Sequence, residues 1–105
     1  MAWMMLVVAG IFEVVWAFSM KQSAGFTRLL PSVITIVGML VSFALLALSM
    51  RTLPLGTAYT IWTGIGAVGA FVVGIAFLGE QLNFTRVFAA MLIVAGLILM
   101  KTSSE

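Results

Sequence analysis

The chain has 105 residues, of which 64% are hydrophobic and only 8% are charged. A soluble domain of this length could not bury so much apolar surface, so the composition predicts an integral membrane protein. Cysteine and histidine are both absent, which excludes a disulfide scaffold, thiolate chemistry and the most common ligands of transition metals. A net charge of +2 is too small to indicate a nucleic-acid partner, and we expect neither an enzyme nor a bound cofactor.

The first apolar run extends from about residue 2 to residue 20 and contains one charged residue, Glu13. Its start lacks the basic segment and cleavage site of a signal peptide, so we expect it to be retained as a helix. At about 1.5 Å per residue, Glu13 lies near the centre of a hydrocarbon layer about 30 Å thick. An acid at that depth usually faces a cavity and binds a proton or cation. Alternatively, a protonated Glu13 only hydrogen-bonds a neighbouring helix. Gly10 and Trp16 share its helix face and are expected to line the same site.

The second apolar run predicts a helix from about residue 31 to residue 50 with no charge inside it. One of its faces is small and polar and carries Thr35, Gly38, Ser42 and Ser49. Hydroxyls in membrane helices commonly bond their own backbone, and this is one reading of Ser42. The other reading is that Ser42 lines the cavity and hydrogen-bonds Glu13.

The third helix is predicted from about residue 57 to residue 78, with two aromatic residues, Tyr59 and Trp62, on one face near its start. Aromatic residues at that position either belong to an interfacial belt or form walls of the site. The same helix is rich in glycine, and the spacing of Gly66, Ala70 and Gly74 indicates close packing against another helix. Gly64 and Gly66 also form a flexible pair, which is typical of a hinge.

The fourth helix is predicted from about residue 85 to residue 101. Ala89 and Gly96 lie seven residues apart on one face, so this helix is a candidate dimerisation surface. Arg86 and Lys101, near its two ends, are explained most simply as side chains that reach the lipid headgroups.

The charges of the connecting loops barely favour either orientation in the membrane. Four spans place both chain ends and the second loop on one side. The basic residues are Arg51 and Lys101 on that side, and Lys21, Arg28 and Arg86 on the other. This difference is too small for the positive-inside rule to select one orientation, so we expect insertion both ways. Many transporters pair two repeats of opposite topology around a central site. An antiparallel homodimer would build such a site with two copies of Glu13.

Carboxylates in a membrane interior, with no cation inside the first three helices to pair with them, attract protons or an organic cation. If both compete for the same carboxylates, and the protein changes its facing only when the site is occupied, the result is antiport. Trp16, Tyr59 and Trp62 present flat negative faces that suit delocalised or quaternary cations. The chain has no nucleotide-binding loop, so any pumping is expected to be coupled to ions.

These residues together resemble the small multidrug resistance family over nearly the whole chain. The shared motifs are the mid-helix Glu13, Lys21 at the helix end, Gly25-Phe-Thr-Arg28 followed by Pro31-Ser32, and Pro54-Leu-Gly-Thr-Ala-Tyr59-Thr-Ile-Trp62-Thr-Gly64-Ile-Gly66. The resemblance implies an all-α membrane protein of four transmembrane helices, which forms an antiparallel, dual-topology homodimer in the cell membrane and exchanges protons for a cation by alternating access. By the same resemblance, the essential carboxylate falls on Glu13, the substrate-lining aromatics on Tyr59 and Trp62, and the hinge on Gly64 and Gly66.

Trp16 refines the expected substrate. Exporters of bulky quaternary ammonium drugs in this family usually carry a small residue there, so Trp16 together with Lys101 resembles the guanidinium-exporting branch. A carboxylate holds a planar guanidinium through two hydrogen bonds, and its faces stack on aromatic rings. We therefore expect proton-coupled guanidinium export, with Glu13 binding proton or substrate, Trp16 and Trp62 forming walls, and Ser42 and Tyr59 orienting Glu13.

Three alternatives remain open at this point. The first is an exporter of many quaternary ammonium compounds on the same scaffold. The second is a passive cation channel, and the third is a small structural subunit of a larger membrane complex. Competition by tetraalkylammonium ions of increasing size would identify the first. Cation flux that is not coupled to protons would identify the second. The third predicts that Glu13→Gln harms assembly and that there is no transport activity to lose.

Overall fold

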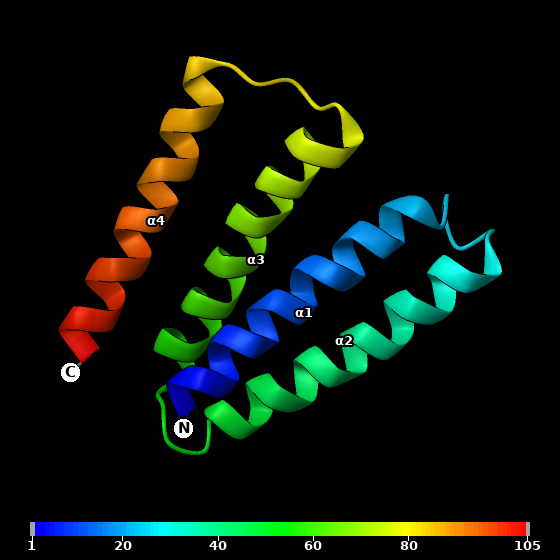
Figure 1. Ribbon diagram of the computed structural model, residues 1–105. Coiled ribbons are helices and arrows are strands. Elements are labelled where there is room, and N and C mark those ends of the chain that lie inside the picture. Colours follow the sequence, from blue (N-terminus) through cyan, green and yellow to red (C-terminus); the bar gives the residue numbers. More distant parts are fainter. Residues whose placement is uncertain (1, 105) are drawn as a thin grey trace.

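The structure is a computed structural model that describes residues 2–104, and its regular elements are four helices (Figure 1). They are α1 (Ala2–Gln22), α2 (Leu29–Ser49), α3 (Leu55–Leu78) and α4 (Phe84–Ser104). All four are long and apolar enough to cross a membrane. A helix satisfies its backbone hydrogen bonds internally, which is what a chain in hydrocarbon requires. The predicted all-α membrane fold is confirmed.

The helices begin and end within three residues of the predicted positions. The helix α2 begins at Leu29, two residues before Pro31, because the first turn of any helix has free N–H groups and tolerates proline. The helix α3 begins directly after Pro54, whose extended backbone forms the N-cap. Tight turns and short loops join the four helices into antiparallel neighbours.

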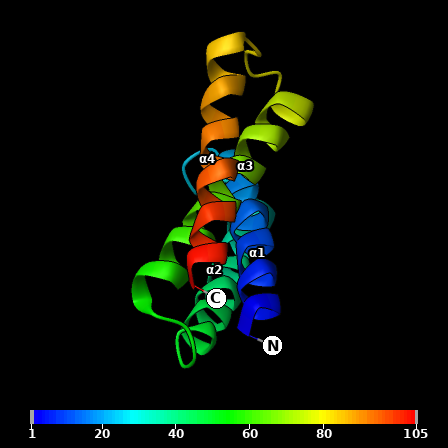
Figure 2. The ribbon, with the colours of Figure 1, turned by 90° about the vertical axis from the view of Figure 1, so that its left-hand side faces the viewer.

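The helices form a row and not a closed bundle. The helix α1 packs against α2 and α3, while α3 also packs against α4; among the described residues no backbone contact joins α4 to α1 or α2. The molecule measures 42 × 34 × 16 Å, and the side view shows how thin it is (Figure 2). Both chain ends and the loop between α2 and α3 lie at one end of the molecule, and the other two loops lie at the opposite end (Figure 1). Such a row does not surround a central chamber.

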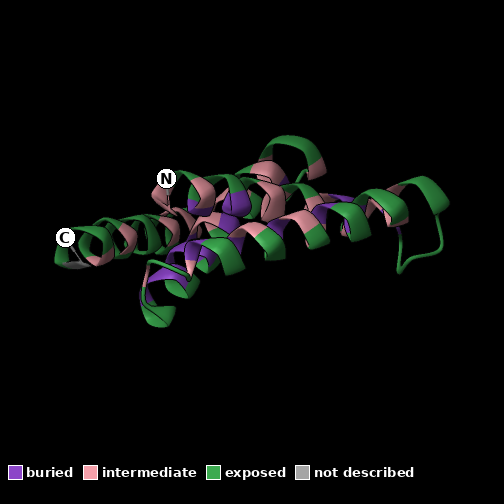
Figure 3. Cartoon of the chain, turned by 90° about the horizontal axis from the view of Figure 1, so that it is seen from below, coloured by how far each residue is buried: buried purple, intermediate pink, exposed green. Residues whose placement is uncertain are grey.

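The core is small and lies where α1, α2 and α3 cross. Its buried hydrophobic residues are Leu6, Ala9, Leu46, Ala58, Ile61 and Trp62. Most other large apolar side chains point outwards, as expected for a surface that contacts lipid. In Figure 3 the buried positions follow α1, α2 and α3, whereas no residue of the α4 span is buried. The helix α4 packs along α3 and therefore presents most of its remaining surface to lipid or to another chain.

The loop between α1 and α2 is held by one buried serine. Ser23 Oγ donates a hydrogen bond to Met20 O at 2.6 Å and accepts one from Phe26 N at 3.0 Å. Three successive residues adopt left-handed backbone angles, Ala24 (φ 50°), Gly25 (φ 76°) and Phe26 (φ 67°). For Ala24 and Phe26 this conformation costs free energy, since their Cβ atoms crowd the backbone.

Candidate functional site

The centre of the candidate site is Glu13, which lies in the middle of α1 and faces α3. Gly66 of α3 lies directly against its carboxylate, and a Cβ atom at position 66 would overlap the carboxylate oxygens. One turn further on, Gly69 provides the same space for the side chain of Val14. Two glycines of α3 therefore allow the helix to approach α1 closely at Glu13.

The carboxylate of Glu13 is left without a partner. Its Oε1 atom is buried and accepts no hydrogen bond from any described residue. Burying an acceptor without a hydrogen bond is costly, so such a group calls for a functional explanation. Within residues 2–104 no group of three or more potential ligands could hold a metal ion. The arrangement suits the binding of a proton or of a cation with N–H donors.

Trp16 lies one helical turn from Glu13 and packs against α2. Gly38 of α2 makes room for it, because a Cβ atom there would lie 3.2 Å from Trp16 Cβ. The indole Nε1 of Trp16 is also buried and has no acceptor among the described residues. The same face of α1 thus carries an unpaired acceptor and an unpaired donor, three residues apart.

Ser42 connects three helices. Its hydroxyl donates to the Ala9 carbonyl of α1 at 2.6 Å and accepts a hydrogen bond from Trp62 Nε1 of α3 at 2.9 Å. The expected hydrogen bond from Ser42 to Glu13 is therefore wrong for this structure, and so is bonding within its own helix. One hydroxyl has one proton to donate, and Ala9 O takes it. In an α-helix the carbonyl of residue 9 also accepts from the N–H of residue 13. Ser42 thus holds the backbone turn that carries Glu13, and not the carboxylate.

Four aromatic rings form a continuous row from α1 through α2 to α3. Their centroids lie 6.2 Å apart for Trp16–Phe43, 5.7 Å for Phe43–Trp62 and 5.7 Å for Trp62–Tyr59. Trp62 is buried, whereas Tyr59 is 53% exposed and makes no hydrogen bond to Glu13 in the described structure. Sequence reasoning missed Phe43, because one more apolar residue in an apolar run carries no signal beyond its position next to Ser42.

Two predicted residues have packing contacts that the sequence did not specify. Gly10 is buried against Ile65 of α3, and Gly64 is buried against Leu97 of α4. The helix α3 is continuous through Gly64 and Gly66, so hinge motion there stays a prediction. Lining of the site by Gly10 also stays a prediction.

Ala89 and Gly96 are both exposed on α4. Each borders a groove beside α3, and the groove at Gly96 has a volume of about 480 Å³. A Cβ atom added at Gly96 would meet nothing within 4 Å. The structure contains one copy of the chain, so their part in a dimer interface is still a prediction.

Four apolar spans and an unpaired acid at mid-membrane depth define a small multi-pass membrane protein. The family described as Small Multidrug Resistance protein has a model that matches residues 1–93. Since the match covers most of the chain, the protein belongs to the small multidrug resistance family.

Similar proteins are known from several bacteria. The chain is 56% identical to a protein of Citrobacter freundii, to one of Salmonella typhimurium and to one of Escherichia coli (strain K12), each named "Guanidinium exporter". In each comparison the identity extends over 105 residues and covers 100% of both chains.

Proposed function

We propose that this protein exports guanidinium across the membrane in exchange for protons. The observation that carries the proposal is the Glu13 carboxylate, which is unpaired at mid-membrane depth and seated against Gly66. Proteins 56% identical to this chain over its full length are named guanidinium exporters. The substrate is then a small, planar organic cation, and no nucleic acid or cofactor takes part.

Glu13 would bind either a proton or the substrate, but not both. A guanidinium ion presents pairs of N–H donors that match the two oxygens of an ionised carboxylate. A proton on the carboxylate neutralises its charge and occupies one of those oxygens. The proton and guanidinium compete for the Glu13 carboxylate. If the protein moves the opening of its site from one side of the membrane to the other only when the carboxylate is occupied, each guanidinium exported must be exchanged for protons. The Gly64–Gly66 pair of α3 is the proposed hinge for that change.

The aromatic row would select for flat cations. The row begins at Trp16, one helical turn from Glu13, and continues through Phe43 to Trp62. Guanidinium can stack on aromatic faces while its edge bonds a carboxylate. The bulk of Trp16 reduces the space for a tetrahedral quaternary ammonium ion. Tyr59 lies at the exposed end of the row, near the start of α3, and is also proposed to line the substrate site.

A second, inverted copy of the chain would complete the site. The row of helices leaves Glu13 on a slab 16 Å thick, which has no chamber of its own. An antiparallel homodimer would cover the site and contribute a second Glu13. The helix α4 offers the surface for this pairing through Ala89 and Gly96, since no residue of its span is buried within one chain.

The test is guanidinium-driven proton movement in proteoliposomes containing wild type or Glu13→Gln. We expect coupled proton flux in wild type and none in Glu13→Gln, which keeps the shape of the side chain but removes its charge. Arg28→Gln, which removes one charge outside the spans, should keep the coupling. Flux with tetraalkylammonium but not guanidinium would contradict the substrate assignment. Guanidinium flux without proton movement would indicate a channel, and no flux at all would favour a structural subunit.

A further inference from the structure

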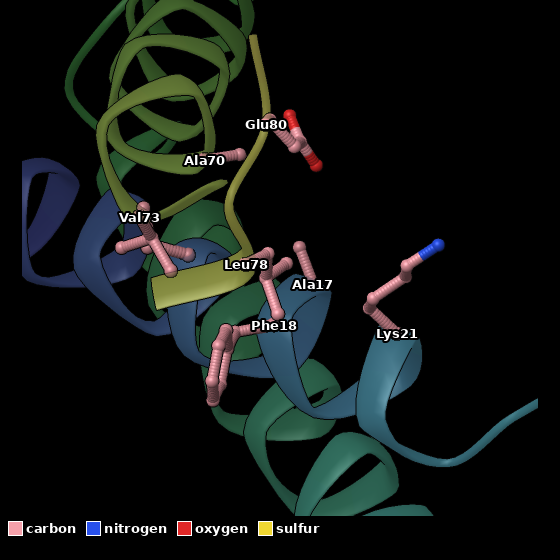
Figure 4. Close-up of a pocket in the computed structure, with 8 residues that line it drawn as sticks. Ala17, Phe18, Lys21, Ala70, Val73, Leu78 and Glu80 are labelled. Carbon is pink, nitrogen blue, oxygen red and sulfur yellow. The ribbon is translucent and has the colours of Figure 1, made fainter. Parts of the chain in front are cut away.

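A pocket between α1 and α3 lies one helical turn from Glu13 and Gly66, where Ala17 and Ala70 line it, towards the loop end of the molecule (Figure 4). Its volume is about 120 Å³. Val14, which follows Glu13, and Ala70, one turn beyond Gly66, line its inner part. Lys21 and Glu80 lie at the outer part, and Figure 4 shows their charged groups on the same side, apart from the apolar side chains.

The position of Glu80 follows from two glycines. Gly79 ends α3 with a left-handed backbone (φ 67°), and the next N–H, that of Glu80, donates to Gly74 O at 3.1 Å. This turn folds the Glu80 side chain back over α3. Its carboxylate lies against Gly74, where a Cβ atom would come within 2.5 Å of Glu80 Oε1. The chain therefore places a carboxylate at the mouth of the pocket with specific backbone geometry.

A guanidinium group of the protein itself already contacts this carboxylate. Arg86 Nη2 lies 3.5 Å from Glu80 Oε1, a long contact between two side chains that are 37% and 41% exposed. Arg86 is positioned independently by donating to Gln81 O at 2.7 Å and by lying 5.2 Å from the centre of the Phe71 ring. A carboxylate has about four acceptor positions, so Glu80 keeps the capacity to bind a second donor.

We propose that Glu80 forms an outer binding site for guanidinium, from which the cation passes through the α1–α3 pocket to Glu13, and that Arg86 competes with it for the Glu80 carboxylate. This inference rests on the proposed function, which supplies the class of cation. The pocket volume is several times the roughly 10–15 Å³ that a cavity needs to hold one water. Guanidinium has four non-hydrogen atoms, so the pocket has room for it.

Lys21 gives the outer site a low affinity. Its ammonium group borders the same pocket and repels a cation that approaches Glu80. Weak binding suits a site on a transport path, because a cation must leave it as readily as it arrives. The two cations near Glu80, Lys21 and Arg86, come from α1 and α4.

The test compares KM and maximal rate of guanidinium-driven proton flux for wild type, Glu80→Gln and Arg86→Gln. We expect Glu80→Gln to raise KM about two- to fivefold at unchanged maximal rate, the range typical of one exposed ion pair. Arg86→Gln should lower KM by up to about twofold, because it frees the carboxylate. Because the two variants should change KM in opposite directions, the result distinguishes direct competition for Glu80 from general damage to the loop.

Arg28→Gln is the matched control. It changes the net charge as Arg86→Gln does and lies at the same end of the molecule, but Arg28 contacts Gln22 O and not Glu80. Its KM should equal that of wild type. An equal decrease in KM for both arginine variants would overturn the proposal in favour of general surface potential. An unchanged KM for Glu80→Gln in a protein that still exchanges guanidinium for protons would overturn the outer site alone. Absence of guanidinium transport by wild type would overturn the proposed function together with this site.

Discussion

The two halves of α3 differ in how tightly they are held. The first half, up to Gly66, packs on α1 and α2 and contains all but one of the buried residues of the helix; beyond it, only Gly74 is buried. In the first half, Ser42 joins α1, α2 and α3 by hydrogen bonds. In the second half, no hydrogen bond between described residues joins α1 to α3, and cavities of about 120 and 320 Å³ lie between them.

Glu13 lies at the boundary between these two regions, because its carboxylate meets Gly66. We call the first half of α3 the packed half and the second half, beyond Gly66, the open half. In the open half, α1 and α3 are connected by the apolar contact of Phe18 with Phe77, whose ring centres are 6.3 Å apart. Opening this half breaks apolar contacts, such as those of Val14 with Gly69 and of Phe18 with Phe77, whereas opening the packed half also breaks buried hydrogen bonds. We therefore expect changes in access to Glu13 to occur mainly in the open half, with the packed half as the fixed part.

The largest effect should come from the boundary itself. Gly66→Ala adds a Cβ atom that overlaps the Glu13 carboxylate, and overpacking of this kind costs about 1–3 kcal/mol. We expect coupled guanidinium flux in proteoliposomes to fall at least about tenfold, which corresponds to about 1.4 kcal/mol. Gly56→Ala is the control. Gly56 lies in the same helix, and a Cβ atom added there would meet nothing within 4 Å. Equal flux from both variants would show that the close contact is dispensable.

The packed half should lose stability when its buried hydroxyl is removed. Ser42→Ala leaves the Trp62 N–H without an acceptor and should lower the free energy of unfolding in detergent by about 1–3 kcal/mol. Adding Trp62→Phe to Ser42→Ala should recover part of the loss, because both hydrogen-bonding partners are then absent. Ser32→Ala, which removes an exposed hydroxyl bonded to Arg28 O, should change stability by less than about 0.5 kcal/mol. Equal losses for the two serine variants would contradict the role of Ser42.

The aromatic row crosses the packed half and should affect substrate affinity. Phe43→Leu removes the ring between Trp16 and Trp62. We expect KM for guanidinium to rise about two- to fivefold, as for loss of part of a cation–π surface worth roughly 0.5–1 kcal/mol. Phe88→Leu serves as control, because Phe88 stacks on Phe84 of α4. The row would have no part in binding if Phe43→Leu left KM unchanged.

The smallest effect on transport concerns the loop at the open end. Ala24→Gly relieves a left-handed backbone angle and should raise the free energy of unfolding by about 1 kcal/mol. Gly25→Ala should lower it by a similar amount, since glycine adopts such an angle without strain. Neither variant should change KM. A loss of stability in Ala24→Gly would show that the loop conformation differs from the one described.

Much of this structure follows from the sequence. Four long apolar runs predict four spans, because hydrocarbon admits few other structures. The lone acid in the first run identifies Glu13, since an intramembrane charge is costly unless it is used. The aromatic pair Tyr59 and Trp62 is expected to share a helix face, and their rings do contact each other.

The remaining features depend on how helices cross. Periodicity shows which residues share a face of one helix, but not which residue of another helix they meet. Ser42 was expected near Glu13 and bonds Ala9 O instead, one turn away. The small-residue series through Gly66 predicted close packing, yet its partner at Gly66 is a carboxylate and not a helix backbone. Phe43 could not be distinguished from its apolar neighbours before the crossing of α1, α2 and α3 was known.

The most direct test of competition at Glu13 is proton release when guanidinium binds. Purified protein in detergent is mixed with guanidinium in weakly buffered solution at a series of pH values, and the change in pH is measured. Wild type should release protons over a limited range of pH, and Glu13→Gln should release none, because the same carboxylate binds either partner. Binding of guanidinium to wild type without proton release at any pH, or equal release by Glu13→Gln, would contradict exchange at Glu13.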